Sequence, residues 1–194
     1  MARGEQDWDG LPLDLVAQPH IRLSGAINDG VLQSFLSQIE GLPTGDGPVA
    51  VELTTEGGDA ETGRRIALEI GLARQRLARR LVFIGKTMVY SAGVTIMGGF
   101  PRGDRFLTHD AMLLVHSRTL QKNLLLEGPL KASLQRTQRL VAEIENGIRL
   151  EREGYAQLIA GSGVTMEEIE EKADRNWYIP APEALDRGLV AGLV

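Results

Sequence analysis

The sequence predicts an α/β fold of repeated βαβ units, with one long helix that protrudes from the domain. Short apolar runs typical of buried strands alternate with segments of helical periodicity. The loops between them are only a few residues long, which favours parallel strands joined by crossover helices. One helical pattern, over residues 129–160, is too long for a small domain to cover.

The first half of the chain predicts two strands and two helices. HIRLSG, residues 20–25, predicts a short strand that ends in a turn, and residues 31–39 (VLQSFLSQI) have helical spacing. VAVELTT, residues 49–55, is typical of a buried strand. After the glycine-containing stretch EGGDAETG, a helix is expected over residues 63–79.

The second half predicts two further strands and several helices. LVFIGK, residues 81–86, is the next buried strand, and residues 91–99 (SAGVTIMGG) predict a helix of small residues. The strand AMLLVHS, residues 111–117, follows. Near the C-terminus we expect a helix over residues 165–173, which begins with a capping box, and a short helix that starts at Pro182.

The long helix is predicted from apolar residues that recur at intervals of three, four or seven. They are Leu130, Leu134, Val141, Ile144, Ile148, Tyr155 and Ile159. Pro129 suits a first helical position, and GSG at residues 161–163 ends the pattern. At 1.5 Å per residue the helix would be about 46 Å long, so its far end must protrude and its apolar stripe must meet another chain. The alternative is a kink or break near Asn146 and Gly147.

Composition narrows the class of protein. The chain has 194 residues, 43% hydrophobic and 24% charged, which suits one folded domain with a core. A net charge of -5 with no block of basic residues argues against a nucleic-acid partner. With no cysteine, disulfides and thiolate metal sites are excluded. There is no apolar core of a secretory signal and no run near the roughly 20 residues that span a bilayer, so we expect a cytoplasmic protein with no membrane partner.

Polar residues and glycines stand where the predicted strands end, and the first such stretch is EGGD at residues 56–59. Without a Cβ, Gly57 and Gly58 let the backbone approach a ligand and direct N–H groups at a developing oxyanion. The alternative is an ordinary strand-to-helix turn.

Ser91, in VYSAG, is the candidate nucleophile. It lies between a predicted strand and a predicted helix, the context of a nucleophile elbow, although the first glycine of G-x-S-x-G is absent. At a helix N-terminus the positive dipole end would favour negative charge, and the N–H of Ala92 could donate to an oxyanion. The alternative is a serine that only caps the helix.

His116 is the candidate general base, because it ends the strand AMLLVH and the chain has only two other histidines, His20 and His109. The alternative is a structural histidine. Asp174 and Asn176 are the polar residues near the C-terminus that could orient it, although Asp174 by itself reads as a surface charge.

Taken in this order, the four stretches resemble the proteolytic subunit family of the Clp (caseinolytic) protease. TEGG is similar to the family's SPGG-like turn, VYSAG to its nucleophile segment, MLLVH to its strand that ends in histidine, and NWYIPAPEALDRGLVA to its C-terminal tail. The resemblance implies a ClpP/crotonase-type fold. It also implies a lead-in segment over residues 1–19 and a single peptidase domain over residues 20–194, with a handle at about 117–160.

The resemblance implies Ser91 as nucleophile, His116 as general base, and the N–H groups of Gly58 and Ala92 as oxyanion donors. At the third triad position, where the family has aspartate, this chain has Asn176. An amide there can cost about 10⁴ in rate. Asp174, two residues earlier, is the alternative third member.

The implied function is that of a serine endopeptidase without metal or organic cofactor, which degrades unfolded polypeptide through an acyl-enzyme. The family stacks two seven-membered rings through the handles and works with a ring ATPase. Here the lead-in is short and SRTLQKN replaces the proline and glycines after the histidine, which puts ATPase docking in doubt. The rival hypotheses are a weakly active or non-catalytic ring subunit, a crotonase-like acyl-CoA enzyme, and a Ser-Lys dyad that uses Lys86.

Overall fold

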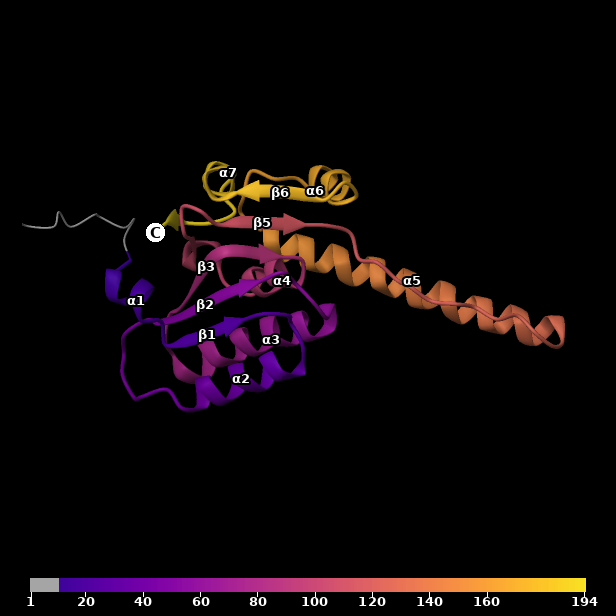
Figure 1. The fold of residues 1–194 in the computed structure, drawn as a ribbon, viewed down its shortest axis with the longest axis horizontal. Coiled ribbons are helices and arrows are strands. Elements are labelled where there is room, and N and C mark those ends of the chain that lie inside the picture. Colours follow the sequence, from indigo (N-terminus) through magenta and orange to yellow (C-terminus); the bar gives the residue numbers. More distant parts are fainter. Residues whose placement is uncertain (1–10) are drawn as a thin grey trace, which may run out of the picture.

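A computed structural model describes residues 11–194 of the chain. These residues form a seven-stranded sheet with helices on both faces, and helix α5 extends far beyond this body (Figure 1). In chain order the elements are α1 (Leu13–Ala17), β1 (Ile21–Ser24), α2 (Asp29–Glu40), β2 (Val49–Thr55), α3 (Ala60–Leu77), β3 (Leu81–Tyr90), α4 (Ala92–Gly98), the 3₁₀ helix η1 (Arg102–Asp104), β4 (Arg105–Leu107), β5 (Met112–Val115), α5 (Leu130–Ile159), α6 (Met166–Ala173), β6 (Trp177–Pro180), α7 (Ala181–Asp186) and β7 (Gly192–Leu193).

The sheet has the order β1-β2-β3-β4-β7, and β5 pairs with both β3 and β6. All neighbouring strands are parallel except β6, which runs antiparallel to β5. Strand β3 pairs with β4 through residues 83–85 and with β5 through residues 88–90. Between them Thr87 has a φ of 58°, and the register against β2 shifts there. The predicted strand at residues 81–86 was therefore four residues too short.

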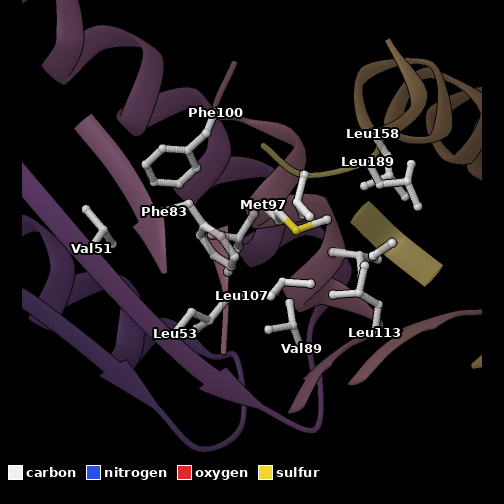
Figure 2. Close-up of a cluster of buried hydrophobic side chains, with 14 of the residues drawn as sticks. Val51, Leu53, Phe83, Val89, Met97, Phe100, Leu107, Leu113, Leu158 and Leu189 are labelled. Atoms are coloured by element: carbon white, nitrogen blue, oxygen red, sulfur yellow. The ribbon is translucent and has the colours of Figure 1, made fainter. Parts of the chain in front are cut away.

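The two faces of the sheet bury separate apolar clusters, because alternate residues of β2 and β3 point to opposite sides. On one face Val51 and Phe83 join side chains from α4 and from the base of α5, and Figure 2 shows this cluster with Met97 and Leu158. On the other face lie Leu11, Val16, Ala50, Val82, Ile84, Phe106 and Val194. Helix α1, within the expected lead-in of residues 1–19, thus packs on the sheet. The first ten residues of that lead-in lie outside the described part of the chain.

Helix α5 is continuous, as predicted, and is not broken at Asn146 and Gly147. Its 30 residues span about 45 Å, and Figure 1 shows most of this length projecting from the body. Residues 116–129 run out along the helix to its tip before the chain returns (Figure 1). The outer part exposes apolar side chains, with Leu130 88% and Ile148 54% exposed. The predicted protruding handle is confirmed.

A buried arginine fixes the base of α5. Arg105 is only 2% exposed and donates to the carbonyl groups of Phe100, Leu158, Leu189, Gly98 and Gln157, at 2.9, 2.6, 3.4, 3.2 and 3.0 Å. These carbonyls belong to the ends of α4 and α5 and to the segment before β7. Burial, and to a smaller extent the charge of Arg102, lowers the pKa of Arg105 to about 10. Arg105 therefore ties the handle to helix α4.

Candidate active site

A pocket of about 330 Å³ lies at the carboxyl ends of β2, β3 and β5. Its lining includes Gly58, Ser91, Ala92 and His116, which come from three separate stretches of the sequence. Because the three strands are parallel, their carboxyl ends meet at one edge of the sheet, where ligand sites of α/β folds commonly lie. The structure therefore brings four of the predicted site residues together.

Ser91 occupies the turn between β3 and α4 in a strained backbone conformation. Its φ of 53° and ψ of -115° lie outside the regions that residues with a side chain ordinarily adopt. Backbone strain of this kind clusters at functional sites. The Ser91 N–H donates to the carbonyl of Leu114 at 2.9 Å, which anchors the turn to β5. Its side chain makes no capping hydrogen bond to α4. The hydroxyl group is therefore not used to cap the helix.

The glycine pair after β2 packs directly against this turn. A Cβ on Gly57 would lie 2.7 Å from the Cβ of Ser91, and one on Gly58 would lie 2.4 Å from the carbonyl oxygen of Ile27. Both glycines have positive φ, 110° and 145°. Other residue types would clash at both positions, so only glycine lets the backbone come this close to the serine.

Two residues of the pocket lining, Gly58 and Ala92, have main-chain N–H groups without an acceptor in the described residues. Ala92 is the first residue of α4, so its N–H has no partner one turn back. The N–H of Gly58 lies between Gly57 and Asp59, whose own groups pair with the main chain of Ile27 at 2.7 and 2.8 Å. Free N–H groups beside a hydroxyl have the arrangement of an oxyanion hole.

His116 follows β5 and is half-buried in the pocket lining. Its Nδ1 lies 2.8 Å from the carbonyl oxygen of Ser117. Tyr155, which also lines the pocket, donates its hydroxyl hydrogen to the main-chain carbonyl of His116 at 3.2 Å. Burial, then the nearby charge of Glu151, raises the pKa of Tyr155, so its phenol keeps its proton.

Neither candidate for the third triad position lines the pocket. Asn176 is exposed with a φ of 59°, and within residues 11–194 its side chain has no hydrogen-bond partner. Asp174 is exposed too, and its carboxylate accepts from the hydroxyl of Ser117 at 2.6 Å rather than from His116. The third member, Asn176 or Asp174, stays a prediction.

Charged residues at the pocket were missed by sequence reasoning. Arg118 contributes to the lining, and its guanidinium donates to the carboxylate of Glu61 at 2.7 Å, while its N–H donates to Glu151. The hydrogen bond from Arg118, and then that from Arg64, holds the pKa of Glu61 below its usual value. The segment SRTLQKN, which contains Arg118, departs from the family pattern. This departure was the sequence signal that could have pointed to Arg118.

The remaining side chains of interest lie elsewhere. Lys86 pairs with Glu52 at 2.6 Å and donates to the carbonyl of Val16 at 2.8 Å, away from the pocket lining. In residues 11–194 no cluster of three or more acidic, histidine or cysteine side chains is placed to hold a metal ion. No helix in this part of the chain has the length and apolarity to cross a membrane.

Comparison with known proteins identifies the family. The family profile described as Clp protease matches residues 3–194. Two ATP-dependent Clp protease proteolytic subunits, from Streptococcus uberis and Prochlorococcus marinus, are each 25% identical, over 100% and 94% of this chain and 92% and 86% of their own length. A solved structure of a Listeria monocytogenes ClpP1 mutant, with an asparagine replaced by aspartate, is 19% identical over 94% of each chain, with a TM-score of 0.71. That likeness confirms the expected ClpP-type fold. Because the profile spans nearly the whole sequence, this chain is a member of the Clp protease family.

Proposed function

We propose that the chain is a cytoplasmic proteolytic subunit of a Clp-type protease, a serine endopeptidase that degrades unfolded polypeptide. The observation that carries the proposal is the pocket itself. It combines a strained serine whose hydroxyl does not cap a helix, a histidine, and two N–H groups without acceptors. The printed names of the relatives, ATP-dependent Clp protease proteolytic subunits, point to the same function.

The pocket supports hydrolysis through an acyl-enzyme. His116 takes the proton from the hydroxyl of Ser91, and the serine oxygen attacks the peptide carbonyl carbon. The N–H groups of Gly58 and Ala92 donate to the oxyanion that forms. His116 then gives its proton to the leaving amine, and water, activated in turn by His116, releases the acyl group. No metal or organic cofactor enters this scheme.

The third triad position limits the expected rate. The family register assigns it to Asn176, with Asp174 as the alternative. An amide oxygen can accept from the histidine but supplies no charge for the imidazolium, at a cost of up to about 10⁴ in rate. A weakly active or non-catalytic ring subunit is therefore the second candidate, and the absence of any acidic side chain on His116 in the described residues favours it.

We further propose that the subunit forms rings that stack through their handles, two rings of seven as in the family, with a ring ATPase as possible partner. The exposed apolar side chains along α5 support this assembly, because one small domain leaves them uncovered. These exposed positions extend from Leu130 to Ile148 of the 30-residue helix, and Figure 1 shows the outer part of α5 projecting from the body.

Labelling with a serine-reactive fluorophosphonate tests the proposal. Wild type should be labelled on Ser91, as located by mass mapping, and Ser91→Ala should not be labelled. Ser37→Ala, which changes an exposed serine on α2, is the matched control and should label like wild type. Equal labelling of wild type and Ser91→Ala would refute the assignment.

A further inference from the structure

The imidazole of His116 has a main-chain partner rather than a side-chain one. Its Nδ1 lies 2.8 Å from the carbonyl oxygen of Ser117. A carbonyl oxygen only accepts, so Nδ1 must carry the hydrogen and donate it. In the neutral imidazole the other ring nitrogen, Nε2, then carries no hydrogen. This is the tautomer that a general base needs in order to take a proton from a serine hydroxyl.

Ser117 is held in place from both sides. Its N–H donates to the carbonyl of Ala173 at 3.3 Å, and its hydroxyl donates to the carboxylate of Asp174 at 2.6 Å. The next residue, Arg118, is fixed by Glu151 of α5 and by Glu61 of α3. The carbonyl of Ser117 therefore has a defined position, which it would lack in an unattached loop.

We propose that the main-chain carbonyl of Ser117 fixes the tautomer of His116, and that Asp174 is a positioning residue that acts through the hydroxyl of Ser117. The inference rests on the proposed peptidase function. It deepens that function because it explains how a chain with Asn176 at the third position keeps its base correctly protonated. A carbonyl dipole stabilises an imidazolium less than a carboxylate does, so hydrolysis stays slow.

His20 provides an internal reference for the tautomer of His116, because its hydrogen bonding requires the opposite tautomer. Nδ1 of His20 accepts from the N–H of Ala50 at 3.2 Å, so neutral His20 carries its hydrogen on Nε2. Burial, and next the charge of Arg79, lowers the pKa of His20, which keeps it neutral. The two histidines are thus expected to show opposite tautomers in one sample.

Magic-angle-spinning NMR of the full assembly with ¹⁵N-labelled histidine reads these tautomers directly. Spectra are recorded at about pH 8.5, above the ordinary imidazole pKa, and the three histidines are assigned with His→Gln variants. His116 should appear with its hydrogen on Nδ1 and His20 with its hydrogen on Nε2. In Ser117→Ala and Asp174→Ala, His116 should become a mixture of tautomers, while His20 stays unchanged.

Peptidase kinetics add a second readout. Ser117→Ala and Asp174→Ala should each lower kcat by about 10-fold, the value of one hydrogen bond to a charged group, with KM within about twofold. The double variant should fall no further than either single one, because both remove the same contact. Ser117→Thr and Asp174→Asn keep a hydroxyl donor and an oxygen acceptor, so they should retain most of the rate. Glu171→Ala, an exposed change on α6, is the matched control.

Three results would overturn the inference. They are a His116 hydrogen on Nε2 in wild type, an unchanged tautomer and kcat in both Ser117→Ala and Asp174→Ala, and a tautomer that is lost in Asn176→Ala only. Failure of the peptidase proposal is a separate observation, namely no fluorophosphonate on Ser91. In that case the NMR spectra still decide which group fixes the tautomer of His116.

Discussion

Replacing Arg105 with lysine should destabilise the protein strongly although the charge is kept. The arginine donates to five carbonyl groups while only 2% exposed. Lysine has three donors on a single nitrogen, so at least two carbonyls lose theirs. At about 1.5–3 kcal/mol for each hydrogen bond that involves a charged group, the free energy of unfolding should fall by about 3 kcal/mol or more. For a chain of this size this lowers Tm by roughly 6–12 °C.

Thermal unfolding followed by circular dichroism measures this change. All variants are compared at one protein concentration, because assembly makes Tm depend on concentration. Arg102→Lys is the matched control, since Arg102 is exposed three residues away, and its effect on stability should stay within about 0.5 kcal/mol. If Arg105→Lys melts within about 2 °C of Arg102→Lys, the five hydrogen bonds do not hold α4 and α5 together and the reasoning is wrong.

Three further predictions concern assembly, the glycine turn and acid stability. Val141→Glu with Ile148→Glu should convert a large multimer into smaller species by light scattering, because both changes put charge on the exposed apolar stripe; a monomeric wild type at micromolar concentration would contradict the handle role. Gly57→Ala should lower kcat at least 10-fold, since its Cβ would lie 2.7 Å from that of the candidate nucleophile, whereas Gly71→Ala meets no atom within 4 Å and should be silent. Hydrogen bonds from Lys172 and Arg187 lower the pKa of Glu168, so its contribution to stability is present above the ordinary glutamate pKa and is lost as pH falls through the lowered value. Glu168→Gln should reduce the fall of Tm with decreasing pH in the acid range. An unchanged slope of Tm against pH would contradict this role of Glu168.

Much of the fold could be predicted because its signals are local. The run VAVELTT is strand β2 over the same residues, since β-branched side chains on a sheet buried on both faces leave little ambiguity. Helix α5 was predicted within one residue at each end, because Pro129 and the GSG stretch mark its limits. The four pocket residues could be predicted as a group because parallel strands bring their carboxyl ends together.

Other features depend on tertiary contacts that no short window contains. The second half of β3 was missed because Thr87 adopts a left-handed conformation that interrupts the strand period. Strand β4 has only three residues, too few for a periodic signal, and β6 ends in a proline, which is unusual inside a sheet. The ion pair of Arg118 with Glu61 joins residues 57 apart, and the hydrogen bond of Ser117 with Asp174 has the same separation. Such pairs become visible only once the chain is folded.

The two ends of the handle respond differently to ionic strength. Near its outer part, residues 116–129 are attached to α5 through the pair of Lys122 with Glu143. The side chains of this pair are about half exposed, so added salt weakens their attraction. At the base, the charge of Arg105 meets the negative dipole ends of α4 and α5 away from water, where salt has little access. Raising the salt concentration should therefore weaken the attachment of residues 116–129 to the handle before it weakens the base of α5. In the ring assembly that we propose, contacts between subunits can then be exchanged while α4, which begins beside Ser91, stays anchored.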